Sequence, residues 1–228
     1  MNNKFVFYFI VIFFFSCANT EVDNDIRVLV KGFVVDQDNM PLQDAKISIY
    51  ADANSLGASE VLLGEGISDN EGAFKITSLF GSNNLFYVTV ELDNHYSKYR
   101  FQTSTEEYIP DDLVFDLGTV ELVQLTNFNY TIIRESGENT ILNYSFRFIE
   151  PSCTEVFNET ILDVENSQCY EVRQISRQLN NIYPNIEDSQ LIVPLQSQVE
   201  FIYSINNAEF ISQIIDVNIL EYEFEFNY

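Results

Sequence analysis

Three cysteines and a single histidine are the side chains of this sequence best suited to nucleophilic, redox or metal chemistry. Cys17 directly follows an uninterrupted apolar run, whereas Cys153 and Cys169 lie in the second half of the chain. Two cysteines in an exported protein are typical of a disulfide. A bridge between them would close a loop of about 15 residues, which the chain-entropy account values at ~3 kcal/mol. Two reduced cysteines in a core are the alternative; zinc is disfavoured because a CxxC spacing and a histidine partner are missing.

The first 17 residues have the three-part form of an export signal. Lys4 precedes the apolar run of residues 5–15, which is too short to span a bilayer because a spanning helix needs about 20 residues. The junction of Ser16 and Cys17 resembles the lipobox of bacterial lipoproteins, although Phe14 stands where that family usually has Leu. The resemblance implies that residues 1–16 are removed as a signal peptide and that the Cys17 thiol carries diacylglycerol.

Lipidation at Cys17 would place the protein on the outer membrane of a Gram-negative bacterium. Each buried CH₂ group of an acyl chain contributes ~0.8 kcal/mol, and more than one chain is needed for stable anchoring. Residues 17–25 would then form the lipidated cysteine and a short polar tether.

Ordinary secretion is the alternative to lipidation. Ser16-Cys17-Ala18 also fits the small-x-small rule of the general signal peptidase. Cleavage after Ala18 would remove Cys17 and release a soluble protein. We favour the lipoprotein interpretation because the cysteine lies directly at the end of the apolar run.

The other polar residues form no catalytic or metal-binding pattern, and we expect no cofactor. His95 lies in a turn before a strand, where a lone histidine is more often an exposed polar residue than a ligand or a base. Acidic turns at residues 36–39, 69–71 and 111–112 offer oxygen ligands for calcium, but none has the Gly and Glu positions of an EF-hand. Acidic residues are common in turns because their side chains bond to nearby backbone amides. We therefore predict no metal site.

The charge of the chain excludes one class of partner. The 35 Asp and Glu residues outnumber the 11 Lys and Arg residues, which gives a net charge of −24. Such a field repels phosphate backbones and anionic lipid head groups. We therefore expect no nucleic-acid binding and no membrane attachment through a basic patch.

Short strand patterns separated by turn residues run through residues 26–122. Residues 46–50 alternate between polar and apolar types, as a strand with one buried face should. Residues 36–41 and 68–72 are clusters of turn formers, and Asn39 tolerates the left-handed conformation that such turns need. Several short strands at this spacing, without a convincing helix, predict an antiparallel β-sandwich.

Two stretches of this first unit resemble carboxypeptidase regulatory-like domains. They are Gly32-Phe33-Val34-Val35-Asp36 with Asn39-Met40-Pro41-Leu42, and Ser68-Asp69-Asn70-Glu71-Gly72 followed by an aromatic strand. The resemblance implies a seven-stranded, transthyretin-like β-sandwich and no catalytic activity. Asn39 and Asp44 stand where that family often has Gly, a substitution that a turn can accept.

The second half, residues 126–228, continues the strand pattern and predicts a second β-sandwich, with an immunoglobulin-like arrangement as one form. Residues 128–134 and 140–148 would form a hairpin around a five-residue loop. The last nine residues alternate strictly between apolar and mostly acidic types. Val172, Ile175, Leu179 and Ile182 recur at helical spacing, which favours a short helix. No Pro- or Gly-rich linker separates the halves, so we expect them to pack together.

These observations predict a non-catalytic, lipid-anchored envelope protein that binds an envelope protein partner or acts as a scaffold. A carbohydrate-binding accessory of a glycan-uptake system is the second hypothesis, and it requires exposed aromatic residues in segments 51–63 or 96–108. An unrecognised hydrolase is the third, and it requires a pocket with converging polar groups.

Overall fold

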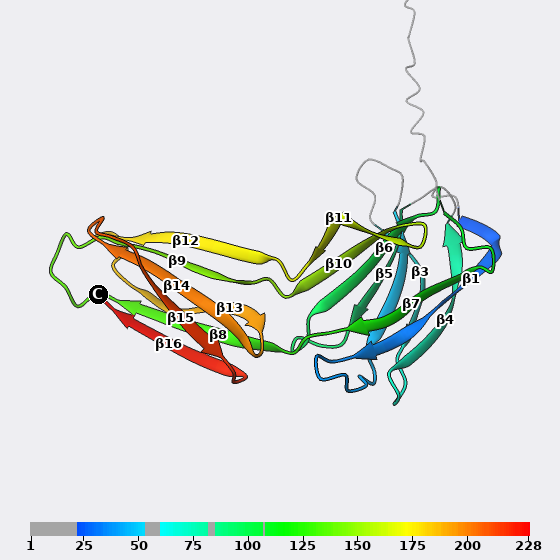
Figure 1. Cartoon of the computed structure of the whole chain (residues 1–228), viewed down its shortest axis with the longest axis horizontal. Coiled ribbons are helices and arrows are strands. Elements are labelled where there is room, and N and C mark those ends of the chain that lie inside the picture. The colour runs from blue at the N-terminus through cyan, green and yellow to red at the C-terminus, as the bar shows by residue number, and fades with distance from the viewer. Residues whose placement is uncertain (1–21, 53–59, 82–84, 107) are drawn as a thin grey trace, which may run out of the picture.

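The computed structural model describes residues 22–52, 60–81, 85–106 and 108–228, which form two β-sandwiches joined end to end (Figure 1). The prediction of an all-β protein with antiparallel sandwiches is confirmed. The signal peptide, residues 1–16, and Cys17 lie outside the described residues. Within those residues, no helix is long and apolar enough to cross a membrane.

The first sandwich contains seven strands from the first half of the chain. One sheet has the order β4-β1-β7, and the other contains the run β3-β2-β5-β6. The strands are β1 (Val22–Val35), β2 (Lys46–Ala51), β3 (Val61–Ile67), β4 (Ala73–Gly81), β5 (Leu85–Glu91), β6 (Lys98–Ser104) and β7 (Val114–Glu121). The core lies between the sheets because alternate apolar residues of each strand, such as Ile47, Ile49, Phe86 and Val88, are fully buried.

Residues with a left-handed backbone conformation form turns of this sandwich, as the sequence predicts. Asn39 has a φ angle of 61° and Asp44 one of 63°. The sequence predicts that these two turns accept a residue other than glycine, and the positive φ angles of Asn39 and Asp44 confirm it. Gly72 also has a positive φ, 75°, and its carbonyl accepts a hydrogen bond of 2.8 Å from the Val34 amide.

Replacing Gly72 by Ala should destabilise the first sandwich by about 2–4 kcal/mol. The added Cβ would lie 2.4 Å from the Val34 carbonyl oxygen, and the left-handed backbone would carry additional strain. Denaturant unfolding measures the effect. Gly137→Ala is the matched control because its Cβ would meet nothing within 4 Å, so a change within about 0.5 kcal/mol is expected. Equal effects of the two substitutions would contradict the argument.

The second sandwich repeats the strand order of the first. Its sheets are β12-β9-β14-β15 and β13-β8-β16, and in both units the first strand is parallel to the seventh. The strands are β8 (Leu125–Ile133), β9 (Leu142–Ile149), β12 (Val172–Leu179), β13 (Ile186–Pro194), β14 (Ser197–Ile205), β15 (Ile211–Val217) and β16 (Glu221–Asn227). An immunoglobulin constant-type domain instead pairs its first strand with its second. The suggested immunoglobulin-like arrangement is therefore not the one found.

Aromatic rings fill the second core. Phe128, Phe146 and Phe201 are fully buried, and the Phe146 and Phe201 ring centres are 5.0 Å apart. Phe224 of β16 lies 5.0 Å from Phe201 and 5.8 Å from Phe128. The alternation predicted for the last nine residues is confirmed, because Phe224 and Tyr228 are buried while the intervening acids are exposed.

A two-stranded ribbon connects the sandwiches. Strand β9 continues into β10 (Ser152–Asn158), and β11 (Ile161–Cys169) continues into β12. The two halves of the ribbon remain hydrogen-bonded where they cross, from the Glu150 amide to the Glu171 carbonyl (2.8 Å) and from the Tyr170 amide to the Ser152 carbonyl (2.9 Å). Beyond the crossing, β10 pairs in parallel with β6, which extends the first sandwich's sheet to the order β11-β10-β6-β5-β2-β3.

The observed strand pairing differs from three predictions made from the sequence. Residues 152–169, placed within the second unit at 126–228, complete a sheet of the first. The expected helix around Ile175 is strand β12, whose eight residues pair with β9. The expected hairpin does not form, because β8 and β9 belong to opposite sheets. In each case the deciding partner is distant in sequence, and burying the apolar face against that partner outweighs the local pattern.

Candidate functional site

A groove of about 1060 Å³ lies where the two sandwiches meet. Domain junctions are a common location for ligand sites. The groove is bordered by six segments: the loop before β6, the start of β8, the end of β9, strands β12 and β13, and the turn before β16. Its apolar lining includes Tyr96, Leu125, Phe148, Ile175, Leu191, Ile192 and Leu220, and its polar lining includes Asn94, Ser97, Asn127, Ser152 and Gln190.

The loop before β6 is fixed to the segment that links β7 to β8. The Ser97 amide donates to the Val123 carbonyl (2.8 Å), and the Val123 amide donates back to the Ser97 hydroxyl (2.9 Å). The Leu125 amide donates to the His95 carbonyl (2.7 Å). These bonds join the first sandwich to the first strand of the second, so the two walls of the groove are held by backbone contacts.

Three of the chain's eleven basic residues line the groove: Lys98, Arg173 and Arg177. Lys98 pairs with Glu91 (3.0 Å) and Arg173 with Glu150 (2.8 Å). Arg177 makes no ion pair with any residue that the structure describes; its charge acts instead on the buried Tyr144. The groove is therefore much less acidic than a chain of net charge −24 would suggest, and Arg177 is available to an acidic or polar ligand group.

His95 lies at the rim of the groove and is largely exposed, as predicted. Its Nδ1 atom is 3.3 Å from a carboxylate oxygen of Asp93. The same oxygen accepts a hydrogen bond from the His95 amide (2.7 Å). The Ser97 hydroxyl is already bonded to Val123 and lies 3.4 Å from the Tyr170 hydroxyl. Within the described residues, no hydrogen bond joins the imidazole to a serine.

Tyr96 is half-buried between the sandwiches. Burial raises the pKa of its hydroxyl above the ordinary value, and the nearby Asp36 and Asp93 carboxylates raise it further. The Tyr96 hydroxyl therefore stays protonated at neutral pH, as a hydrogen-bond donor. The other aromatic residues of segment 96–101, Tyr99 and Phe101, are buried in the core and are not part of an exposed platform.

Cys153 and Cys169 form a disulfide, and the predicted bridge is confirmed. They face each other across β10 and β11, immediately beyond the crossing of the ribbon. Glu155 lies within 4.8 Å of both sulfur atoms. Its carboxylate accepts a hydrogen bond from the Tyr99 hydroxyl (2.6 Å), and the two sulfurs are bonded to each other, so the cluster has no thiolate to offer a metal.

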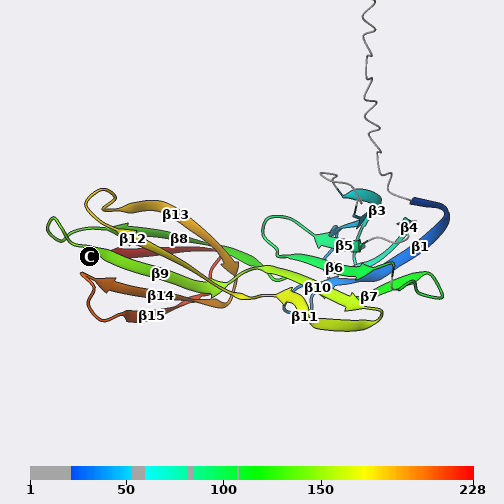
Figure 2. The same ribbon diagram turned by 90° about the horizontal axis from the view of Figure 1, so that it is seen from above.

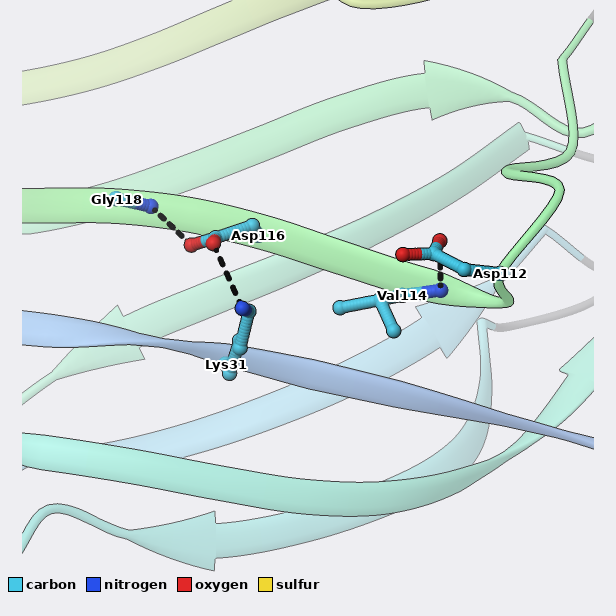
Figure 3. A network of polar contacts seen from close by, with 5 residues as sticks. All are labelled: Lys31, Asp112, Val114, Asp116 and Gly118. Carbon is cyan, nitrogen blue, oxygen red and sulfur yellow. Dashed lines mark hydrogen bonds and ion pairs between the residues drawn. The ribbon is translucent and has the colours of Figure 1, made fainter.

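The acidic turns considered for calcium use their carboxylates on backbone amides. Asp36 accepts from the amides of Asp38 and Met40, and Asp69 from those of Glu71 and Ala73. Figure 3 shows the third case, in which Asp112 accepts from the Val114 amide (3.1 Å). These contacts are those of ordinary turns.

Asp116 in the same view makes a polar link between β1 and β7. Its carboxylate accepts a hydrogen bond from the Gly118 amide (3.0 Å) and pairs with Lys31 (3.0 Å) (Figure 3). The amide and then the ammonium group hold the pKa of Asp116 below its usual range. Both side chains are substantially exposed, so the pair contributes at most about 1 kcal/mol.

Sequence reasoning did not find the groove, because its lining comes from six separate segments without a common motif. The available signal was the rarity of basic residues, since Arg173 and Arg177 lie close together in an acidic chain.

No family model matches the sequence, and no curated protein matches it. Among solved structures, the chain is similar to the Bacillus anthracis TIE protein, with 12% identity over 89% of this chain and a TM-score of 0.33. It is similar to a shaft pilin of Lactobacillus rhamnosus GG, with 8% identity over 89% of this chain and 98% of the pilin, and a TM-score of 0.33. A 9R-lipoxygenase from Cyanothece shows 18% identity over 42% of this chain, with a TM-score of 0.32.

The chain spans 34% of the TIE protein and 16% of the lipoxygenase. Because all three TM-scores are close to 0.3, these likenesses decide nothing about activity.

Proposed function

We propose that this chain is a non-catalytic binding module of the bacterial cell envelope, held on the outer membrane by lipid on Cys17. The junction groove is the observation that carries the binding role. Its walls come from both sandwiches, and the chain passes between them three times, at residues 122–124, 150–151 and 170–171. A site held in this way is pre-formed, which lowers the entropy lost when a partner binds.

The order of strands in the first sandwich supports the resemblance to carboxypeptidase regulatory-like domains. Seven strands from the first half of the chain form two facing layers, with the predicted turns at Asn39 and Gly72. Modules of this kind present surfaces to other proteins. An envelope protein with an acidic or amide-rich segment fits the groove, because Arg177 and the neighbouring amide side chains can pair with such groups.

Site-specific cross-linking on intact cells tests the binding role. A photo-reactive residue at Gln190, which lines the groove, should give a reproducible adduct with one envelope protein. The same residue at Gln43, an exposed position outside the groove, is the matched control and should give none. Adducts of equal yield at both positions, or none at Gln190, would refute a role for the groove.

The charge of the groove offers a second test. Arg177→Gln should reduce the Gln190 adduct several-fold if Arg177 pairs with the partner. Arg147→Gln removes an equal charge from the outer face of β9 and should leave the adduct unchanged. An unchanged adduct in the Arg177 variant would remove that residue from the proposal.

Fatty-acid labelling tests the anchor separately. The wild-type protein should incorporate labelled fatty acid and fractionate with the outer membrane, whereas Cys17→Ser should do neither. Equal labelling of the two proteins would refute lipidation and leave the secreted form cleaved after Ala18.

Carbohydrate is the second candidate ligand, and the groove lining favours it specifically. The Tyr96 ring and the amides of Asn94, Asn127 and Gln190 are groups that contact sugar faces and hydroxyls. Titration of envelope glycans should then change the tyrosine fluorescence of the protein, and Tyr96→Ala should abolish the change. No response at millimolar glycan would remove this candidate.

A further inference from the structure

Strand β15 is one of the two outer strands of the sheet β12-β9-β14-β15 (Figure 2). It pairs with β14 on one side only. In the described part of the chain, no strand covers its other side. An open strand edge presents a row of backbone amides and carbonyls that can pair with another strand.

The other outer strands have features that discourage such pairing. Charged residues within a strand and bulges that break its register both do this. The strands β3, β7, β11 and β13 have a register shift. The strands β4, β12 and β16 have charged residues along their length: Lys75, Arg173, Arg177, Glu221, Glu223 and Glu225.

Strand β15 has neither feature over most of its length. Its pairing with β14 runs without a shift from Ile211 to Val217, and Asp216 is its only charged residue. Phe210, Ile211 and Ile214 are 64%, 54% and 54% exposed. Exposed apolar residues on an edge strand with an unbroken register and a single charge favour association through strand pairing.

The first sandwich shows how the equivalent edge is covered. In its strand order β6 occupies the place that β15 occupies in the second sandwich. Strand β6 is covered by β10, which continues from β9 of the second sandwich. The β6 edge of the first sandwich is therefore covered by a strand, whereas the equivalent β15 edge of the second sandwich is open.

We propose that two copies of this chain pair through β15, antiparallel about a twofold axis, so that two four-stranded sheets become one continuous sheet. The sequence of β15 is self-complementary in this arrangement. With the axis at Ile214, Asp216 lies opposite Ser212 of the second copy; with the axis at Gln213, it lies opposite Phe210. Neither register places acid against acid, and Ile211 meets an apolar residue in both. This local fit favours a second copy over a partner of unrelated sequence as the occupant.

The test is the oligomeric state of residues 17–228 with Cys17→Ser, so that no lipid contributes to association. Sedimentation at high salt is appropriate because salt screens the repulsion between two acidic chains. A concentration-dependent dimer is expected, and Ile214→Lys should weaken it at least tenfold. Leu62→Lys is the matched control because Leu62 is 47% exposed in the outer strand β3 and does not line the groove, so its dimer should be unchanged.

Cross-linking locates the contact. Directly opposed residues of antiparallel strands are about 4.5–5.5 Å apart, within the span of a disulfide. Ile214→Cys or Gln213→Cys should therefore form a covalent dimer under oxidising conditions, and Leu62→Cys should not. A wild-type chain that stays monomeric at all concentrations overturns the proposal. Equal weakening of the dimer by Ile214→Lys and Leu62→Lys, or equal cross-linking by Leu62→Cys, also overturns it. None of these three outcomes bears on the groove or on Cys17.

Discussion

Replacing Phe201 by Ala will lower the free energy of unfolding by about 3–5 kcal/mol, the largest effect expected from a single substitution in this protein. The Phe201 side chain is fully buried, and its ring lies 5.0 Å from those of Phe146 and Phe224 and 4.9 Å from that of Phe226. These rings come from both sheets of the second sandwich. Truncation therefore leaves a cavity where the sheets meet, which the surrounding strands cannot fill.

Denaturant unfolding followed by tyrosine fluorescence measures this loss. Phe210→Ala is the control in the same sandwich, since that ring is 64% exposed. At low protein concentration its effect should stay within about 0.5 kcal/mol. A Phe201 variant as stable as the Phe210 variant would mean that the aromatic cluster does not hold the second sandwich together.

Removing the disulfide by the double change Cys153→Ser, Cys169→Ser should cost about 3 kcal/mol. The bridge joins residues 16 apart in sequence, and the chain-entropy account assigns that cost to the freedom gained by the unfolded chain. Reductant should destabilise the wild-type protein by the same amount and leave the double variant unaffected. A double variant that still responds to reductant would contradict this assignment.

The position of the disulfide predicts which strands lose stability first when it is removed. Cys153 and Cys169 are a register pair of β10 and β11 beside the crossing of the ribbon. Amide hydrogen exchange in β10 and β11 should accelerate in the double variant. Exchange in β16, which lies in the other sandwich, should change little. Uniform acceleration throughout the chain would show that the bridge acts globally instead.

Local features of this chain could be predicted well from sequence. The strands around Ile47 and Phe224 were predictable because each buries one face, and burial imposes a period of two. The turns at Asn39 and Asp44 were predictable because those residue types tolerate a positive φ. The disulfide followed from the number of cysteines. Each of these depends on residues close together in the sequence or on a simple count.

The failures concern strand partners. Ile175 and Leu179 are four residues apart, a spacing that places them on one face of a helix and equally on one face of a strand. Only pairing with β9 decides between the two, and Arg177 between them also lies on that strand. In the same way, nothing in residues 152–158 identifies β6 as their partner. The groove depends on these pairings, so it could not be predicted from the sequence.

The ribbon also determines the order in which the protein can fold. The sheet of the first sandwich is not complete until residues 152–169 have joined β6, so that sandwich must wait for a segment made well after its own last strand. A chain cut after Glu121 would expose the β6 edge and lose Cys153, Phe157 and Tyr170 from its core. The two sandwiches therefore form one folding unit, and neither half can be exchanged for another β-sandwich without carrying part of the other.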